Sequence, residues 1–305
     1  MSWNQIKKTL CNPGLVFLML MNKTIISRRI PDKMYLKLKF FFHRHQFLDL
    51  KNPKTFSEKL QWLKLYYRKP EQTMMADKYA VRDYIAKTLG EEYLIPLLGV
   101  WDNPEEIDFD ALPQQFVLKC NHNSGTGMVI CKDKSRLDIK KVKEGLYQGL
   151  KQNFFLLGRE WPYKNIKRKI IAEQFMQDGT NEVLNDYKFM CFHGEVKCCF
   201  LCAERNEKGK AKIIVYDREW KNMEFGRDQV YHMDIPKPAN YEKMIWFAEK
   251  LAKDFPFVRI DFYEINGQLY FGEITFNPAS GMEGFTPEGW DNILGSWIEL
   301  KQEEI

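Results

Sequence analysis

The chain has 305 residues, of which 45% are hydrophobic and 29% are charged, with a formal net charge of +5 at pH 7. This content can bury a large core, which excludes a disordered chain and favours one compact multi-lobed unit or two domains. The cysteine count is odd, and the Cys199–Cys202 pair lies in an apolar run without a second pair to hold zinc. We therefore expect buried thiols in a reducing compartment.

Basic residues are concentrated near the amino terminus. Residues 1–70 contain 15 Lys or Arg and 3 Asp or Glu, a local net charge of +12. Apolar and aromatic residues recur at helical spacing from Met34 to Phe42, with lysines beside them. Such a helix can lie on an anionic membrane surface, or it can pack on the body with its lysines in water. No nucleic-acid recognition motif accompanies the charge, so we expect no nucleic-acid partner.

No secretory signal or membrane span is expected in this region. The apolar run Leu15–Met21 has no small-residue cleavage pattern after it, and a span needs about 20 residues. We expect a cytoplasmic chain. If the membrane interpretation of the basic segment is right, residues 1–70 would attach it to the inner face of the membrane.

Two helices are predicted next. Thr55-Phe56-Ser57-Glu58 has the sequence of a capping box and predicts a helix that continues to about Tyr67. Asp77 can cap a second helix, which ends before Gly90. A basic helical extension over residues 1–76 therefore precedes an α+β body.

A glycine-bearing loop joins the first two predicted strands. The strands are Phe116–Asn121 and Met128–Lys132, and the loop between them covers residues 122–127. Glycines allow backbone N–H groups to approach a polyphosphate closely, and Lys119 can supply a positive charge. A glycine loop is also an ordinary hairpin turn, so this segment alone leaves both interpretations open.

Two further strands follow. One is Ile170–Phe175, and the other opens at Asp186 and runs into a turn at residues 193–195. Residues 204–240 are the least patterned part of the chain, with a hairpin turn predicted at Lys208-Gly209-Lys210. This segment is either a loop near the substrate or an exposed connection.

The most informative stretch is Phe257–Gly281. Arg259 and Asp261 alternate on one strand, Asn266-Gly267 turns the chain, and Leu269–Glu273 returns as the partner strand. One face of this hairpin therefore carries one cation and two carboxylates. The carboxylates can hold a divalent metal such as Mg²⁺, or they can pair with Arg259 or with water.

This order of parts resembles the ATP-grasp fold, in which two α+β lobes enclose ATP. In detail the chain is similar to the TupA-like ATP-grasp family, named for teichuronopeptide synthesis and associated with bacterial capsule and surface-polysaccharide loci. The similarity covers most of the chain and implies lobes over residues 77–175 and 176–305. It is carried by Asn52–Phe56, Glu58–Trp62, Asp77–Tyr79 and Gly272–Phe276.

The resemblance implies a role for each matching residue. Lys78 and Lys119 would contact the ATP phosphates, and Arg259 would face the transferred phosphoryl group and share catalysis with Lys119. Lys188 would also belong to the cofactor-binding set. The residues that would cover the phosphates are Asn123, Ser124, Gly125, Thr126 and Gly127, and those that would hold adenine through backbone groups are Glu173, Gln174 and Phe175.

The implied Mg²⁺ ligands are Asp261 and Glu273. In the wider ATP-grasp pattern an asparagine two residues after the glutamate also binds the metal, and here that position is Thr275. Asn277 lies two residues further on. Side chains two apart on a strand share a face, so the spacing leaves Thr275 and Asn277 both open as the third ligand.

The implied activity is ATP- and Mg²⁺-dependent carboxylate–amine ligation. A carboxylate would be activated as an acyl phosphate, and an amine would displace phosphate to form an amide on a uronic acid or an amino acid. A phosphotransferase acting on a sugar hydroxyl is an alternative that no motif excludes. A non-enzymatic membrane- or polysaccharide-binding module is a second alternative, but it would give Lys119, Asp261 and Glu273 no role. The sequence identifies neither the acid nor the amine, nor the oligomeric state.

Overall fold

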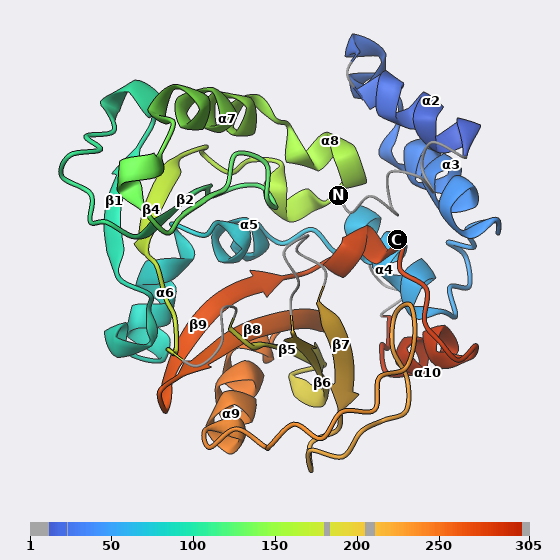
Figure 1. Ribbon diagram of the computed structural model, residues 1–305. Coiled ribbons are helices and arrows are strands. Elements are labelled where there is room, and N and C mark those ends of the chain that lie inside the picture. The colour runs from blue at the N-terminus through green and yellow to red at the C-terminus, as the bar shows by residue number, and fades with distance from the viewer. Residues whose placement is uncertain (1–11, 23, 180–183, 205–210, 301–305) are drawn as a thin grey trace.

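The computed structural model describes residues 12–22, 24–179, 184–204 and 211–300. Two antiparallel sheets form the centres of two lobes, and α5 lies between them in the view of Figure 1. The strands are β1 (Leu97–Trp101), β2 (Phe116–Cys120), β3 (Val129–Cys131), β4 (Ile170–Gln174), β5 (Asp186–Phe192), β6 (Glu195–Ala203), β7 (Lys212–Tyr216), β8 (Phe257–Ile265) and β9 (Gln268–Thr275).

The helices pack on the sheets, lie between them or build the amino-terminal region. A short 3₁₀ turn, η6 (Pro278–Gly281), follows β9, and another, η5 (Trp161–Tyr163), follows the helix Phe154–Gly158. The helices are α2 (Pro13–Asn22), α3 (Asp32–Arg44), α4 (Phe56–Tyr66), α5 (Pro70–Ala76), α6 (Val81–Thr88), α7 (Ile139–Lys151), α8 (Phe154–Gly158), α9 (Tyr241–Ala252) and α10 (Trp290–Ser296).

The capping box predicted for the helix after residue 55 is present. The Thr55 side chain accepts from the Glu58 N–H, and the Glu58 carboxylate accepts from the Thr55 N–H. These two bonds satisfy backbone donors that the first turn of α4 leaves without helical partners. The second predicted helix is α6, which begins at Val81 and is preceded by a turn in which Asp77 Oδ1 accepts the N–H groups of Tyr79 and Ala80. These are the bonds expected of a capping aspartate.

The four-stranded sheet has the order β1-β4-β2-β3. Alternate residues of β2, including Phe116 and Leu118, are buried in a cluster with Val142 and Leu146 of α7. Because side chains alternate along a strand, Lys119 lies on the opposite face of this sheet. The predicted glycine hairpin is confirmed, although its strands end one residue earlier at Cys120 and Cys131.

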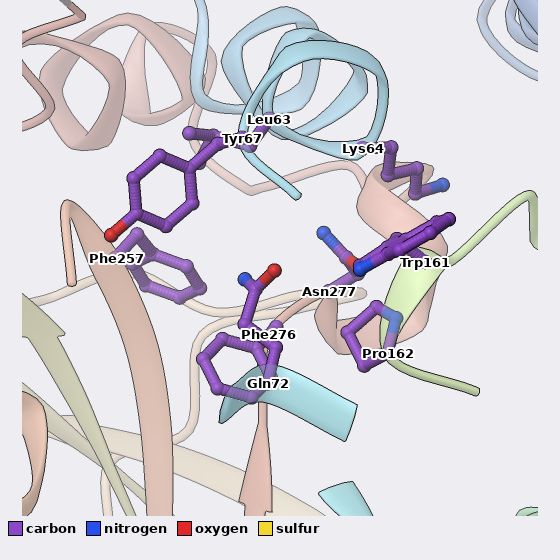
Figure 2. A pocket seen from close by; sticks show the side chains of 9 residues that line it. All are labelled: Leu63, Lys64, Tyr67, Gln72, Trp161, Pro162, Phe257, Phe276 and Asn277. Atoms are coloured by element: carbon purple, nitrogen blue, oxygen red, sulfur yellow. The ribbon is translucent and has the colours of Figure 1, made fainter. Parts of the chain in front are cut away.

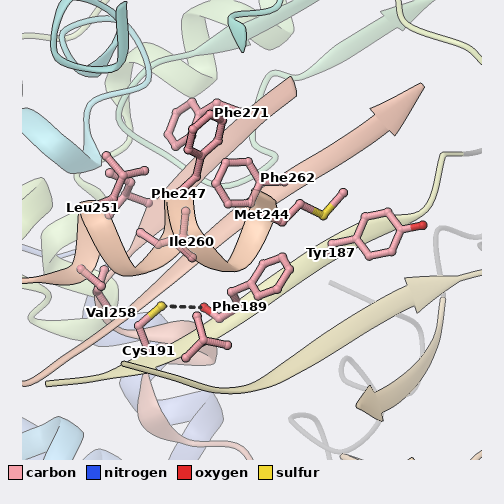
Figure 3. Close-up of a cluster of buried hydrophobic side chains, with 14 of the residues drawn as sticks. Tyr187, Phe189, Cys191, Met244, Phe247, Leu251, Val258, Ile260, Phe262 and Phe271 are labelled. Carbon is pink, nitrogen blue, oxygen red and sulfur yellow. Dashed lines mark hydrogen bonds between the residues drawn. The ribbon is translucent and has the colours of Figure 1, made fainter. Parts of the chain in front are cut away.

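The five-stranded sheet has the order β7-β6-β5-β8-β9. One face packs against α9, whose Met244, Phe247 and Leu251 meet aromatic and aliphatic side chains of the sheet (Figure 3). Each large apolar side chain buried here contributes roughly 1.5–3 kcal/mol to folding. This core supports the sheet from one side and leaves the opposite face available for other contacts.

The other face of the same sheet is divided into two halves. On the apolar half, Phe192, Phe200 and Phe257 pack with side chains of α4 and α10, including Phe56 and Leu294. The second half carries charged side chains of β5, β8 and β9. The cysteines described by the structure are free and buried, as the sequence predicts: Cys120, Cys131, Cys191, Cys198, Cys199 and Cys202.

Two expectations about the remaining chain have different outcomes. The hairpin turn predicted at residues 208–210 lies outside the described residues. Within the described part of the chain, no helix combines the length and the apolar character that crossing a membrane requires.

Candidate functional site

Arg259 occupies the centre of the charged half of the five-stranded sheet. Its Nε donates to Asp261 Oδ1 at 2.7 Å, and its Nη2 donates to Asp261 Oδ2 at 2.8 Å. The same Nη2 lies 2.8 Å from Glu273 Oε1. Asp261 is 1% exposed, and a buried carboxylate is tolerated only when it is paired in this way. The structure therefore brings together the cation and both carboxylates predicted for the hairpin.

A second cation, Lys188, extends this cluster onto β5. Its Nζ lies 2.6 Å from Asp261 Oδ2 and 2.5 Å from Asp186 Oδ2. Burial raises the pKa of Asp186, and the charge of Lys188 opposes that rise. Lys188 was expected to bind the nucleotide, and it faces the same half of the sheet as Arg259.

A β-bulge at Gly272 determines which residue faces Asp261. The ladder pairs Phe262 with Phe271 but Asp261 with Glu273, so Gly272 is the extra residue. Phe271 therefore enters the core beneath α9, while Glu273 lies on the opposite face beside Arg259. A bulge commonly redirects a side chain at a functional site.

The two candidates for a third metal ligand are separated in space. Thr275 Oγ1 lies 3.2 Å from both Arg259 Nη2 and Glu273 Oε1, inside the charged cluster. The strand ends at Thr275, and Asn277 instead lines a cavity of about 10 Å³ with Trp161 and other side chains (Figure 2). The structure thus places Thr275, and not Asn277, among the charged residues.

Glu273 remains ionised because of the cations around it. Burial alone would raise the pKa of this carboxyl, but Lys78, Arg259 and Lys188 lower it well below its ordinary value. Its side chain is 35% exposed, which leaves it the most accessible of the paired carboxylates on this face. Glu273 can therefore offer a negative oxygen to a ligand over the whole physiological pH range.

Lys78 connects the glycine loop with the charged hairpin. Its Nζ donates to the backbone oxygen of Asn123 at 3.0 Å and lies 3.6 Å from Glu273 Oε2. The backbone N–H of Lys78 also donates to Asn121 O. These contacts bring residues of the two predicted lobes to one place.

The predicted phosphate loop has two packed ends and an exposed tip. Asn123 is buried, and its Nδ2 donates to Thr126 O and Gly149 O, which fixes the start of the loop. Ser124 and Gly125 are exposed. Gly127 has φ of +77°, and a Cβ atom there would lie 2.7 Å from Gly145 O. The loop therefore requires glycine at position 127 for both conformation and space.

Lys119 and Glu173 face each other across neighbouring strands of the smaller sheet. Lys119 Nζ lies 2.5 Å from Glu173 Oε2, and Arg82 Nη1 lies 3.5 Å from Glu173 Oε1. The N–H of Gln174 donates to Pro96 O, so this backbone donor is already engaged. Gln174 is exposed and Phe175 is half-buried at the end of β4.

The donor set of the charged half suits a hard divalent cation. Among the described residues, no group of three or more His, Cys, Asp or Glu side chains is arranged to hold a metal ion. Asp261 and Glu273 offer two carboxylates and Thr275 a hydroxyl, which are oxygen donors of the kind that Mg²⁺ accepts. Mg²⁺ commonly takes one or two protein carboxylates and completes its shell with phosphate and water.

Sequence reasoning missed two members of these clusters. Asp186 alternates with Lys188 on β5, and this spacing could have placed both on the charged face. Arg82 lies on α6 and reaches Glu173 only through the packing of α6 beside β4, so no local pattern identifies it.

Comparisons with solved structures find similarity at low identity. D-Alanine–D-alanine ligase from Helicobacter pylori is 16% identical with a TM-score of 0.39, and the match covers 74% of this chain and 63% of that one. Biotin carboxylase from Campylobacter jejuni, in its β,γ-ATP complex, is 12% identical with a TM-score of 0.44, covering 82% of this chain and 54% of that one. This chain therefore spans less than two thirds of either protein.

Comparison with curated proteins finds no match. A model of the TupA-like ATP-grasp family, in contrast, matches residues 58–299, which is most of the chain. The matched range includes both sheets and every residue of the clusters described above. This confirms the α+β ATP-grasp fold expected from the sequence. The chain belongs to the TupA-like ATP-grasp family.

Proposed function

We propose that this protein is an ATP-dependent carboxylate–amine ligase. One observation supports this most directly: Arg259 and Lys188 lie among carboxylates on the charged half of the five-stranded sheet. Lys78 connects this half of the sheet with the glycine loop. Charged groups of both signs that are held close together can stabilise the charge that develops during phosphoryl transfer, because these groups need not reorganise as the reaction proceeds.

The residues of the two lobes would share the nucleotide between them. Lys78 and Lys119 would hold its phosphates, and the N–H groups of residues 123–127 would cover them. The adenine would lie against Glu173 to Phe175, where β4 ends. Arg259 would face the transferred phosphoryl group, with Lys188 beside it.

Asp261 and Glu273 would hold Mg²⁺, with Thr275 as the nearest hydroxyl. The metal, when bound, neutralises phosphate charge. The contacts with Arg259 and the bulge at Gly272 hold both carboxylates in position. Enclosure between the lobes would keep water away from the activated acid.

The substrates follow from the chemistry and the family. An acid would be activated as an acyl phosphate, and an amine would displace phosphate to leave an amide. We propose a uronic acid or an amino acid as the acid, within the biosynthesis of a bacterial capsule or surface polysaccharide. Transfer of phosphate to a sugar hydroxyl is the activity that the experiment must separate from this one.

Trapping with hydroxylamine separates the two activities. The purified chain is incubated with Mg·ATP, hydroxylamine and sets of uronic acids or amino acids, and products are read by mass spectrometry. An acyl phosphate gives a hydroxamate, with Glu273→Gln as the inactive control. A phosphoester without hydroxamate would replace the ligase assignment by a phosphotransferase.

A further inference from the structure

Helices α2 and α3 form an antiparallel pair at the edge of the molecule farthest from α9 in Figure 1. Asn12 Nδ2 donates to Phe42 O at 2.6 Å, and Asn22 Nδ2 donates to the Tyr35 hydroxyl at 2.8 Å. These bonds join the start of α2 to the end of α3 and the end of α2 to the start of α3. The two helices therefore lie side by side along their length.

The inner side of α3 is already packed. Tyr35, Leu36 and Phe40 are at most 1% exposed and belong to the cluster with α4. The Tyr35 hydroxyl also donates to Leu157 O of α8, as does Lys39 Nζ. Phe42 is half-buried and packs against the same cluster, so Met34, Leu38 and Phe41 are the exposed apolar side chains of this helix.

Large apolar side chains nevertheless remain on the outer side. Phe47 is 86% exposed, and its ring stacks on that of Phe41 with centroids 5.1 Å apart. On α3 the exposed apolar residues recur at spacings of four and three, which aligns them along one side of the helix. The set, which we call the α2–α3 surface, is Phe17, Leu20, Met34, Leu38, Phe41 and Phe47.

The exposed charges of α3 and of the segment before it are mostly positive, although Asp49, two residues after Phe47, is also exposed. Arg28, Arg29, Lys33 and Lys37 are exposed, and the two lysines each precede an exposed apolar residue of α3. From residue 24 to residue 48 the sequence contains one acidic residue, Asp32. Its carboxylate lies 2.8 Å from Arg68 and 3.2 Å from Arg159, so it does not offset the exposed lysines.

We propose that the α2–α3 surface docks on an anionic lipid bilayer. Apolar side chains set among basic ones match the boundary between acyl chains and negatively charged headgroups. Large exposed apolar patches usually mark an interaction site, and the positive charge selects an anionic partner for this one. The inference stands apart from the proposed ligase activity, because no residue of the charged half-sheet takes part.

Co-sedimentation of the full chain with vesicles tests the docking. Phosphatidylcholine vesicles are compared with phosphatidylcholine–phosphatidylglycerol vesicles at low and at high salt. The wild type is expected to sediment with the anionic vesicles only, and high salt is expected to release it. Equal binding to both vesicle types, or binding to neither, would overturn the proposal.

Matched variants assign the binding to this surface. Lys33→Glu with Lys37→Glu should weaken binding roughly 30-fold or more, since each basic residue strengthens it about fivefold. Lys140→Glu with Lys141→Glu makes the same charge change on exposed positions of α7 and should bind nearly as well. If the two double variants bind alike, the charge that matters is not on α3.

The apolar contribution needs its own pair of variants. Phe41→Ser with Phe47→Ser should abolish sedimentation, whereas Trp246→Ser, 58% exposed on α9, should not. The lysine variants and Trp246→Ser should keep the wild-type melting temperature and ATP turnover, because the changed side chains are exposed. Phe41 is 37% exposed and its ring contacts that of Phe42, so Phe47→Ser alone, at a position 86% exposed, separates a binding defect from a folding defect. A wild-type dimer that dissociates in Phe41→Ser/Phe47→Ser, without vesicle binding, would show that the surface joins two copies instead.

Discussion

The two hairpins of the proposed site differ in how they hold their functional groups. On the β8–β9 hairpin, Arg259 and Asp261 are buried and paired, and α9 packs behind the sheet. On the β2–β3 hairpin, Ser124 and Gly125 are exposed at the loop tip, although Asn123 and Gly127 hold the two ends of the loop against α7. Groups that stabilise charge in a transition state must be held in fixed positions. A loop that admits a nucleotide must instead be able to open. The difference indicates a rigid charged face and a more adjustable loop tip, which suits the proposed role of the loop as a phosphate cover.

The largest expected effect comes from the carboxylates of the rigid hairpin. Glu273→Gln should lower Mg²⁺-dependent ATP hydrolysis roughly 10²–10³-fold, the usual range for losing one electrostatic contact to the transition state. Its side chain is 35% exposed and Arg259 keeps Asp261 as a partner, so the free energy of unfolding should fall less than in Asp261→Asn. Hydrolysis by Glu273→Gln at the wild-type rate would remove this residue from the metal site.

Asp261→Asn sharpens the comparison between the two hairpins, because this carboxylate is 1% exposed and forms ion pairs with both Arg259 and Lys188. Activity should fall as far as in Glu273→Gln. In addition, Arg259 and Lys188 each lose one of their two carboxylate partners, which costs about 3 kcal/mol in the free energy of unfolding. Urea unfolding of the two variants measures the difference, and equal stabilities would contradict the rigid, internally paired face.

The next effect tests the adjustable hairpin. Lys119→Ala should weaken ATP binding roughly 10- to 100-fold, the range for a hydrogen bond to a charged group. Cys120→Ala is the matched control, because its side chain points to the opposite face and is buried near Leu146. Calorimetric titration gives both affinities, and melting curves exclude a folding defect. Equal affinity of Lys119→Ala and wild type would exclude this hairpin from the site.

A smaller effect distinguishes the two candidates for the third ligand. Thr275→Ala should lower ATP hydrolysis about tenfold, because Thr275 Oγ1 contacts both Arg259 and Glu273. Asn277→Ala should have less effect, since that side chain lines the cavity beside Trp161. The reverse order of losses would mean that Asn277 turns toward the metal in the active enzyme.

The smallest effect concerns the glycines of the phosphate loop. Gly125 and Gly127 both have positive φ, so alanine at either position costs roughly 1–2 kcal/mol of backbone strain. At Gly127 a Cβ would also lie 2.7 Å from Gly145 O, whereas at Gly125 no atom lies within 4 Å. Gly127→Ala should therefore melt at a lower temperature than Gly125→Ala. The opposite order would contradict the close packing of the loop on α7.

Local patterns identified most of the charged hairpin. The Asn266-Gly267 turn and the two-residue alternation place Arg259 and Asp261 on one face, and the capping box places the start of α4. These features depend on residues close together in the chain, and each has one dominant local conformation.

Two parts of the site required the structure. If the regular pairing continued from the turn, Asp261 would pair with Gly272. A β-bulge pairs Asp261 with Glu273 instead, and the only feature of the sequence that indicates this bulge is the glycine itself. Asn277 was expected to share the face of Thr275, but the chain leaves the strand at Thr275 and continues with left-handed φ at Ala279 and Ser280. Alternation fails wherever a strand ends, and its end is set by tertiary contacts such as that of Gln61 with Gly281 O.

The central claim is that the charged half of the five-stranded sheet holds the nucleotide and its metal. Calorimetric titration of Mg·ATP into the wild type and into Glu273→Gln tests this claim most directly. We predict binding by the wild type, weakened roughly tenfold or more by Glu273→Gln and by removal of Mg²⁺ with a chelator. Absence of binding by the wild type, or equal affinity of the two proteins in Mg²⁺, would contradict the account.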